Sequence, residues 1–296
     1  MISHPAPASP DRAGPSGPVG AELSMKAFRA IAAIMQSEAR ISLSEAKMTL
    51  VQSRLSRRLR ERGLARFDDY VRLVHEDEAE RRLMITSLTT NHTHFFRESH
   101  HFDHFRDNVL PSLQQKAAAG LPVRIWSAGC SSGEEVYSLA MTMAGESNAG
   151  AAWLRRTDVK LLATDISPPV VEAVRRATYP ASAVEPIPPA LRSLWLRSHD
   201  AESYLIADEL RSLVTARVLN LFEPWPMRQQ YDAIFCRNVM IYFDEDAKAE
   251  LEARFVDLLA PGGYLYIGHS ERLLGKAATH MAPAGHTIYR KLGGAA

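Results

Sequence analysis

The chain has 296 residues, of which 46% are hydrophobic and 23% charged, and its formal net charge is +1. This length is sufficient for one large or two small domains with an extensive core. The near-zero net charge gives no sign of nucleic-acid binding through overall basicity and no sign of an acidic tail. Each of the two cysteines, Cys130 and Cys236, ends an apolar run, which argues against a disulfide framework and favours a reducing compartment.

The first 22 residues are rich in proline, alanine, glycine and serine. This composition predicts a disordered tail, because such a segment buries too little apolar surface to fold. The tail lacks the charged start and apolar centre of a signal peptide, and no run in the chain approaches the roughly 20 apolar residues that cross a bilayer. We therefore expect a cytoplasmic protein without direct membrane insertion.

Residues 23–90 show helical spacing of apolar side chains and predict a small all-helical domain. Its second helix begins at Ser44, ends near Gly63 and is strongly basic. The basic residues of interest on this helix are Lys47, Arg54, Arg57 and Arg58. Two interpretations of them are open, a solvated helix face or a docking surface for an acidic partner. Further helices are expected to begin at Phe67 and at Glu78.

Residues 91–120 join this domain to the rest of the chain. The junction reads TTNHTHFFRE from Thr89, and its mixture of polar, aromatic and basic side chains is unusual for a linker. Five histidines lie within 92–104, but their spacing matches no zinc motif and no cysteine completes one, so no metal site is expected. A helix is predicted over 102–119.

The segment 123–141 reads VRIWSAGCSSGEEVYSLAM and predicts a strand, a turn of small residues and a helix. This succession opens the nucleotide-binding sites of doubly wound sheets. The turn has Gly129-x-x-x-Gly133 in place of the dinucleotide fingerprint G-x-G-x-x-G, which favours S-adenosylmethionine, a ligand without phosphate. Ser131 and Glu134 also match a capping box, so Glu134 either caps the helix or contacts the ligand.

A second strand is predicted over 159–164, and Asp165 stands at its end. A carboxylate at this strand tip accepts the ribose hydroxyls of a nucleoside ligand in doubly wound folds. Asp165 could instead cap the helix that begins at Pro168 and Pro169, and the spacing leaves both roles open.

The remainder of the chain continues the alternation of strands and helices. Further strands are expected at 216–221, 231–236, 264–268 and, antiparallel to the others, 287–290. Arg237 and Asn238 follow the second of these. Short extended runs at 191–196, 203–206 and 213–215 predict a small antiparallel β-subdomain inserted at about 180–215. Residues 121–296 therefore predict an α/β doubly wound sheet with its site at the carboxyl ends of the strands.

Together these motifs resemble the CheR family of chemotaxis receptor methyltransferases. The resemblance covers essentially the whole chain after the tail and rests on TTNHTHFFRE, RIWSAGCSSGEEVYSLA, LLATDIS, LNL, IFCRNVMIYFD and LLAPGGYLYIGHSE. It implies a helical N-terminal domain, an α/β domain that binds S-adenosylmethionine, and an inserted β-subdomain. The implied activity is methyl transfer from S-adenosylmethionine to glutamate carboxylates of chemoreceptors, which leaves S-adenosylhomocysteine.

The resemblance also implies roles for individual residues. Those that match the family's cofactor contacts are Asn91, Thr93, Arg97, Glu134, Asp165, Asn220, Leu221, Arg237 and Asn238. Gly129 of the turn is expected to contact the same ligand. Arg97 and Tyr242 match the positions close to the transferred methyl group. The basic second helix matches the element that docks on the receptor's acidic methylation region, which favours the docking interpretation of its four basic residues.

The main departure from the family lies in the β-subdomain. Members that bind a C-terminal receptor pentapeptide tend to have a longer loop that contains glycine, whereas 198–203 is short and has none. The sequence therefore argues against tethering to such a pentapeptide. No additional interface element is visible, and a monomer is expected.

The implied chemistry needs no general base, because a glutamate with a pKa near about 4.3 is already an ionised nucleophile at neutral pH. Three alternatives are open. A nucleic-acid methyltransferase would carry an Asn/Asp-Pro-Pro-aromatic motif where this chain has RNVM from Arg237. The others are a non-catalytic sensor or adaptor that binds S-adenosylmethionine, and a methyltransferase that serves a signalling array outside chemotaxis.

Overall fold

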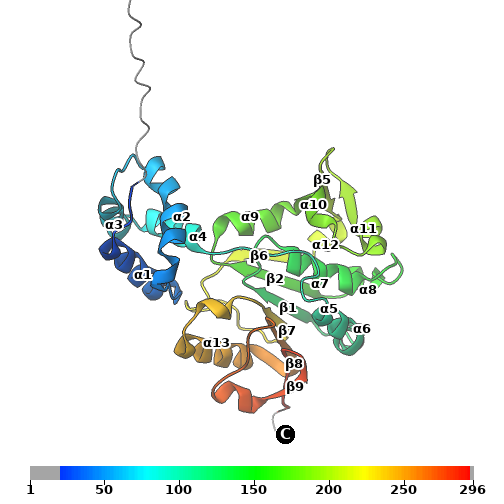
Figure 1. Cartoon of the computed structure of the whole chain (residues 1–296). Helices are drawn as coiled ribbons and strands as arrows, with labels where there is room; N and C mark the ends of the chain where they lie inside the picture. The colour runs from blue at the N-terminus through cyan, green and yellow to red at the C-terminus, as the bar shows by residue number, and fades with distance from the viewer. Residues whose placement is uncertain (1–20, 294–296) are drawn as a thin grey trace, which may run out of the picture. The chain divides into compact units, whose positions relative to one another are not determined.

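The computed structural model describes residues 21–293, and the chain divides into two compact units (Figure 1). Among the described residues, unit 1 comprises 21–31 and 44–88, and unit 2 comprises 32–43 and 89–293. The division falls within the first helix, α1 (Met25–Ala39). Except for its last two residues, the predicted tail of 22 residues lies outside the described part of the chain.

Unit 1 is helical, as its apolar spacing predicts. Its elements after α1 are the 3-10 turn η1 (Glu45–Lys47), α2 (Met48–Glu61), α3 (Phe67–Glu76) and α4 (Glu78–Leu88). The second helix begins as a 3-10 turn, and its α-helical part starts at Met48 rather than near Ser44. Val51, Leu55 and Leu59 are buried along one face of α2, at the spacing that aligns side chains on a helix.

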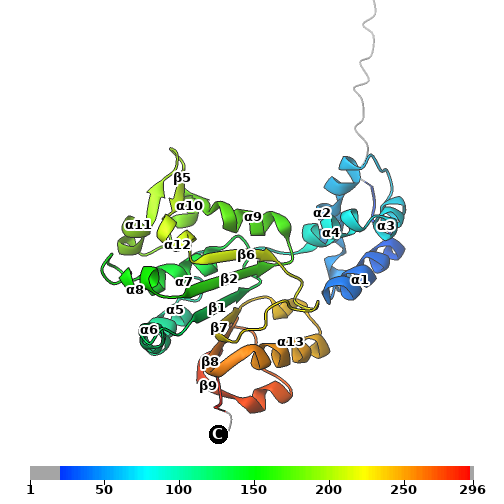
Figure 2. The ribbon, with the colours of Figure 1, turned by 180° about the vertical axis from the view of Figure 1, so that it is seen from behind.

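Unit 2 contains a seven-stranded sheet with the order β6-β2-β1-β7-β8-β10-β9. Its strands are β1 (Val123–Ala128), β2 (Val159–Asp165), β6 (Val214–Val218), β7 (Tyr231–Cys236), β8 (Leu259–Ile267), β9 (Met281–Gly285) and β10 (Ile288–Lys291). The first five in spatial order are parallel, and β10 is antiparallel, as predicted. Strand β9 was not predicted, and residues 219–221 follow β6 as a loop rather than extending it. Figure 2 shows the same strands from behind.

Helices cover both faces of this sheet, and alternate residues of each strand enter two separate cores. Ile125 and Phe235 pack with α7 (Glu134–Ala144), whereas Trp126 and Ile234 pack with α13 (Glu245–Leu258). Further helical elements of unit 2 are α8 (Ala152–Arg156), α9 (Pro168–Arg176), η3 (Met240–Tyr242) and η4 (Lys276–His280). Burial on both faces explains why the central strands β1 and β7 are mostly apolar, whereas the edge strand β6 carries exposed Arg217.

The helix predicted over 102–119 is interrupted. It consists of α5 (His100–His104), a π-helical turn η2 (Phe105–Val109) and α6 (Leu110–Ala118). Pro111 stands in the first turn of α6 and has no N–H to donate to the carbonyl four residues earlier. We attribute the wide turn before it to this missing hydrogen bond.

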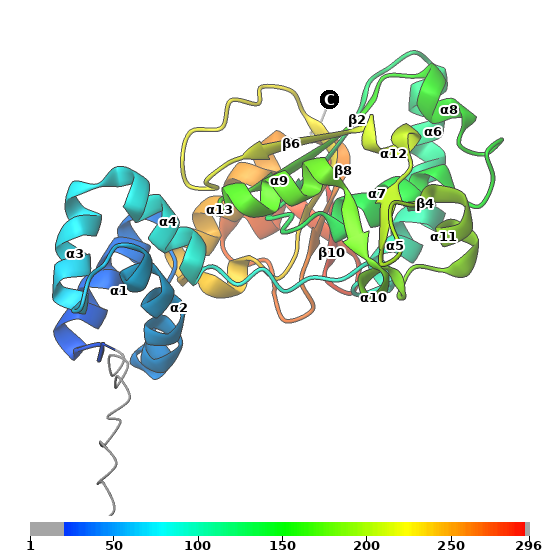
Figure 3. The same ribbon diagram turned by 90° about the horizontal axis from the view of Figure 1, so that it is seen from above.

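The predicted β-subdomain is present as a separate three-stranded antiparallel sheet with the order β3-β5-β4. Its elements are β3 (Thr178–Pro180), α10 (Ala181–Val184), α11 (Pro189–Trp195), β4 (Leu196–Ser198), β5 (Ser203–Ile206) and α12 (Asp208–Arg211). The prediction of an extended run at 191–196 was wrong, because most of it lies in the helix α11 (Figure 3), which begins at Pro189. The run 213–215 was assigned to the wrong sheet, because Val214 and Thr215 begin β6 and pair in parallel with β2.

Candidate active site

The carboxyl ends of the parallel strands meet at one edge of the sheet in unit 2. Strand β1 lies between β2 and β7, so Gly129, Asp165 and Arg237, which follow or end these strands, lie on neighbouring positions. After β1 the chain forms β2 and β6 on one side of this strand, and it later returns to form β7 on the other side. The boundary between β1 and β7 is therefore the switch point of the sheet. Ligands of open α/β sheets bind at such a point.

The glycine turn is fastened to the neighbouring strand by backbone hydrogen bonds. The N–H groups of Gly129 and Cys130 both donate to Thr164 O at 2.8 Å. Gly129 has a φ of +79°, and a Cβ at this position would overlap the Cγ2 methyl of Val239. Both the backbone conformation and the close approach of Val239 therefore require glycine here.

Ser131 and Glu134 do not form a capping box at the start of α7. Gly133 occupies the N-cap of α7, and the hydroxyl of Ser131 donates to Asn91 O at 3.0 Å rather than to the helix. The Glu134 carboxylate is buried and accepts a hydrogen bond from Ser132 Oγ at 2.7 Å, and burial raises the pKa of Glu134. Glu134 thus presents a buried acceptor at the carboxyl edge of the sheet.

Asp165 is 8% exposed and lies between the first two βα turns. Its Oδ2 accepts from Ser131 N and its Oδ1 from Ser167 N, both at 3.0 Å. The N-cap of α9 is Ser167, so Asp165 does not cap that helix. Burial raises the pKa of Asp165 above its ordinary value. The backbone N–H of Ile166 also interacts with this carboxylate, which has about four lone-pair positions and can therefore accept a further hydroxyl donor.

The segment that carries Asn91, Thr93 and Arg97 lies beside α7. Besides the bond from Ser131 to Asn91, the N–H of Phe96 donates to Ser138 Oγ at 2.9 Å. Thr93 is half-buried, and Arg97 Nη1 donates to His92 O at 2.9 Å. The structure therefore brings this polar and aromatic junction to the same strand ends as the glycine turn.

Arg237 is the most buried cation at the site, with a side chain that is 2% exposed. Its Nη1 lies 3.0 Å from Glu135 Oε2, and its Nη2 lies 3.3 Å from Glu98 Oε2 and donates to the backbone oxygen of Arg97. Its guanidinium also lies 5.4 Å from the centre of the Phe102 ring. Arg237 thus joins the end of β7 to α7 and to the junction segment.

Two acidic residues that were not identified from the sequence, Glu98 and Glu271, also organise the site. Glu98 accepts from Asn238 Nδ2 at 3.2 Å, and Glu271 accepts from the N–H groups of Asn238 and Ile241 at 3.3 and 3.1 Å. Glu271 is 6% exposed and also binds Gly268 N at 2.5 Å. Glu98 and Glu271 are the last residues of the motifs TTNHTHFFRE and LLAPGGYLYIGHSE, but nothing in these motifs indicates which groups the two carboxylates hold.

Tyr242 lies in η3, which follows β7, whereas Asn220 and Leu221 lie on the loop that follows β6. The backbone oxygen of Tyr242 accepts from Ser42 N at 3.0 Å, and Asn220 Nδ2 donates to Glu38 O at 2.7 Å. The end of α1 and the residues after it, 32–43, therefore belong to unit 2 and support these loops. Leu221 is buried, and its oxygen accepts from Arg254 Nη1 at 2.6 Å.

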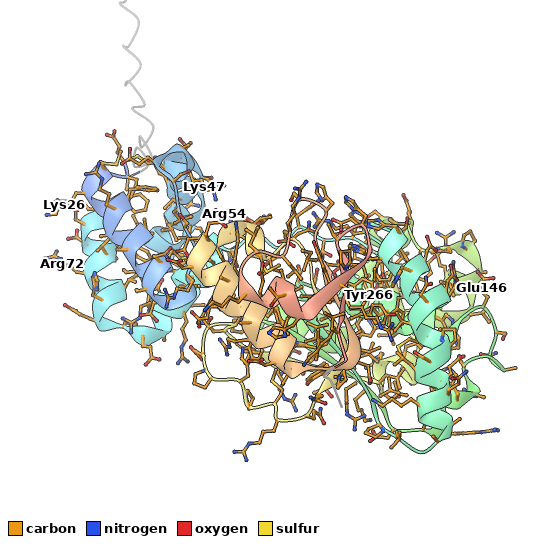
Figure 4. All side chains as sticks on the ribbon, turned by 90° about the horizontal axis from the view of Figure 1, so that it is seen from below. Lys26, Lys47, Arg54, Arg72, Glu146 and Tyr266 are labelled. Atoms are coloured by element: carbon orange, nitrogen blue, oxygen red, sulfur yellow. The ribbon has the colours of Figure 1, made fainter. Side chains whose placement is uncertain are left out.

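Of the four basic residues predicted on the second helix, Lys47 lies in η1 at the N-cap of α2, and the three arginines of α2 differ in their surroundings within unit 1. Arg58 binds Glu80 through two hydrogen bonds of 2.9 and 2.5 Å, and its side chain is 16% exposed, whereas that of Arg57 is 80% exposed and pairs with Glu61. Arg54 Nη1 donates to Leu88 O at 2.8 Å. Figure 4 shows Lys47 and Arg54 on the same side of unit 1.

Comparison with known proteins identifies both parts of the chain. Residues 26–89 match the model of the CheR methyltransferase all-alpha domain, and residues 91–289 match that of the CheR methyltransferase SAM binding domain. Among the described residues no helix is long and apolar enough to span a membrane.

Three related proteins align with this chain over most of its length and most of their own. A probable chemotaxis protein methyltransferase of Rhizobium etli is 44% identical over 262 residues, covering 87% of this chain and 96% of that protein. Chemotaxis protein methyltransferases of Borreliella burgdorferi and Escherichia coli are 38% and 37% identical, covering 82% and 88% of this chain and 87% and 89% of those proteins. The chain therefore belongs to the CheR methyltransferase family, whose S-adenosylmethionine-binding domain it contains.

Proposed function

We propose that this S-adenosylmethionine-dependent methyltransferase esterifies glutamate side chains of chemoreceptors. The names of its relatives support a chemoreceptor substrate, and the glutamate acceptor is part of our proposal. The observation that carries the proposal is the convergence of the junction segment, the glycine turn and Asp165 at the carboxyl ends of β1 and β2 in a chain of this family. This convergence supplies buried hydrogen-bond acceptors for a nucleoside, and Arg97 lies on the same edge of the sheet.

The donor set fits S-adenosylmethionine. The Asp165 carboxylate is a suitable acceptor for the two ribose hydroxyls, and the nearby Ser167 Oγ is buried without a hydrogen-bond partner in the described part of the chain. We assign the Glu134 carboxylate to the positively charged ammonium or sulfonium group of the ligand. Asn91, Thr93, Asn220, Leu221 and Asn238 would complete the contacts.

S-adenosylmethionine supplies an electrophilic methyl group bonded to a positively charged sulfur. In the reaction a glutamate oxygen forms a bond to the methyl carbon while the carbon–sulfur bond breaks and its electron pair remains on sulfur. No proton is transferred, because the glutamate is ionised at neutral pH and the product is an ester. The protein therefore acts by holding the two groups in line and excluding water.

Arg97 and Tyr242 are the residues that we assign to the incoming carboxylate. Arg97 would hold the receptor carboxylate or the carboxylate of the methyl donor by charge-assisted hydrogen bonds. The phenol of Tyr242 would orient the attacking oxygen. Arg237 is paired with Glu98 and Glu135, so in this proposal it supports the strand ends and adds positive charge rather than releasing its side chain to a ligand.

The basic helix α2 is the proposed docking element for the acidic methylation region of the receptor. Lys47, Arg54 and Arg57 supply the charge, and Arg58, which pairs with buried Glu80, holds the helix in unit 1. Arg57→Glu should raise the KM for receptor fragments. Arg72→Glu is a suitable control, since Arg72 is 75% exposed, also pairs within its own helix, and lies away from Lys47 and Arg54 in Figure 4. Equal KM values for the two variants would contradict this docking surface.

The decisive experiment incubates the protein with methyl-labelled S-adenosylmethionine and receptor cytoplasmic fragments from the same organism. Label released as methanol by alkali would establish a glutamyl methyl ester, whereas alkali-stable label would point to another acceptor atom. Binding of S-adenosylhomocysteine without any transfer would support the sensor alternative. Arg97→Ala and Tyr242→Phe should abolish or strongly reduce transfer, and wild-type turnover in either variant would remove that residue from the mechanism.

A further inference from the structure

The carboxylate of Glu98 joins three segments that are distant in the sequence. Its Oε1 accepts from Asn238 Nδ2 at 3.2 Å and lies 3.1 Å from His269 Nδ1, and its Oε2 lies 3.3 Å from Arg237 Nη2. Asn238 and Arg237 follow β7, and His269 follows β8. The Glu98 side chain is only 12% exposed, so these contacts take place largely out of water.

The backbone around Glu98 is held in an unusual conformation. Phe96 and Glu98 have φ values of +54° and +56°, in the left-handed region that residues other than glycine rarely adopt. Arg97 stands between them, and its backbone oxygen accepts a hydrogen bond from Arg237. The conformation of the turn that presents Arg97 therefore depends on the groups that hold Phe96 and Glu98.

The charge of Glu98 balances that of its neighbours. Burial alone would raise the pKa of Glu98, but the Arg237 guanidinium and the hydrogen bonds from His269 and Asn238 lower it to about 2. His101 Nδ1 lies 3.5 Å from Glu98 Oε2, and burial lowers the pKa of His101 to about 3. At neutral pH Glu98 is thus an anion beside the neutral imidazole of His101, and Arg237 is the counter-ion of Glu98.

We infer that Glu98 is a positioning residue, whose carboxylate holds Arg97 and Asn238 in the arrangement that methyl transfer requires. Through Asn238 and Arg237 it fixes the end of β7, and through its own backbone it fixes the turn that presents Arg97. Glu98 contacts neither substrate in this scheme. The inference rests on the proposed function, since it assumes that Arg97 and Asn238 face the substrates.

Glu98→Gln and Glu98→Ala separate the charge from the hydrogen bonds. In Glu98→Gln the side chain keeps an oxygen that can accept from Asn238 and His269, but Arg237 loses one acidic partner. In Glu98→Ala both the charge and the hydrogen bonds are lost. Asp232→Asn is the matched control, because Asp232 is a buried carboxylate at the opposite end of β7, where it pairs with Lys116 Nζ at 2.6 Å. Unfolding temperature is measured for all variants, and assays are run well below it.

We expect kcat/KM for the methyl donor to fall about 100-fold in Glu98→Ala, because a small displacement of a substrate-binding group has effects of this size. Glu98→Gln should lose about tenfold and so show partial rescue, since one charge-assisted interaction becomes neutral. Asp232→Asn should keep the wild-type value despite a comparable loss of thermal stability. If Glu98→Ala does not fold, the comparison of Glu98→Gln with Asp232→Asn carries the test.

The inference is overturned if both Glu98 variants keep the wild-type kcat/KM, or if activity falls in Asp232→Asn to the same extent as in Glu98→Gln. Calorimetric affinity for S-adenosylhomocysteine, measured without receptor, should also fall in Glu98→Gln but not in Asp232→Asn. This second measurement does not depend on the acceptor. A wild-type protein that esterifies no receptor would therefore refute the proposed function while leaving the effect of Glu98 on the site measurable.

Discussion

Gly129 allows the packing at the site to be tested with a single methyl group. In Gly129→Ala the new Cβ would overlap the Cγ2 methyl of Val239 and would lie 3.4 Å from Cγ1, and the backbone would remain at a φ of +79°. The left-handed conformation costs roughly 1–2 kcal/mol for a residue with a Cβ. Overpacking against Val239 adds about 1–3 kcal/mol. The free energy of unfolding should therefore fall by about 2–5 kcal/mol.

Gly120→Ala isolates the conformational part of this loss. Gly120 has nearly the same φ, +77°, but a Cβ there would meet nothing within 4 Å. Urea denaturation should show a loss of about 1–2 kcal/mol for Gly120→Ala, and the difference between the two variants measures the overlap with Val239. The double variant Gly129→Ala/Val239→Ala, compared with Val239→Ala alone, should lose no more than Gly120→Ala.

The same overlap should weaken ligand binding. Val239 follows Asn238 directly, so its displacement moves a predicted contact of the methyl donor, and calorimetry should show a loss of affinity for S-adenosylhomocysteine of about tenfold or more. Gly120→Ala should bind as the wild type does. The reasoning would be refuted if the two glycine variants lost equal free energy of unfolding and bound the ligand equally well.

Three further predictions concern buried carboxylates. Glu80→Ala should lower the free energy of unfolding by about 3–5 kcal/mol in urea, because it leaves Arg58 without its buried partner, whereas Glu78→Ala, at an exposed pair, should cost less than about 1 kcal/mol. Equal losses would contradict this. Burial raises the pKa of Glu252 to about 7, above its unfolded value, so its stabilising contribution is complete below about pH 4 and is lost as pH rises through 7. Relative to Glu252→Gln, the wild-type free energy of unfolding should fall by up to about 3 kcal/mol between pH 4 and 8. If the free energies of unfolding of the two proteins changed in parallel with pH, the raised pKa of Glu252 would be disproved. Asp165→Asn should bind S-adenosylhomocysteine at least about tenfold more weakly while unfolding at the same or a higher temperature, and unchanged affinity would remove Asp165 from the site.

Much of the fold follows from local patterns that the sequence displays directly. Apolar spacing predicts the helices of unit 1, and the run Val123–Trp126 followed by small residues predicts the first strand and its turn. The order of strands and helices predicts the α/β sheet, and short extended runs separated by polar turns predict the β-subdomain. These predictions are confirmed because each depends on residues that are close together in the chain.

Boundaries were less predictable where two local preferences compete. The run 191–196 was read as a strand, but Pro189, which begins α11 two residues earlier, and the packing of Trp195 make most of the run helical. Pro111 interrupts a long helical pattern with a wide turn. Strand β9 is short, and within residues 21–293 its one partner strand is β10, so its formation depends on a segment that follows it in the chain.

The candidate site shows the same division between local and distant information. Sequence alone identifies Gly129, Asp165 and Arg237 as residues at strand ends, since parallel strands place those ends on one edge. It leaves open whether Glu134 and Asp165 cap helices, because a capping motif and a ligand contact use the same residue types. Only the tertiary structure shows that neither residue is an N-cap.

The partners of the buried charges were decided by tertiary structure alone. Arg237 meets the backbone of Arg97 and the carboxylate of Glu98 across about 140 positions of the chain, and Asn220 meets α1 across 182. No periodicity encodes such pairs, because a hydrogen bond depends on where folded segments meet and not on the order in which they occur. The sequence thus determined which elements form and which residues stand at their ends, whereas the packing of those ends determined which charges face one another.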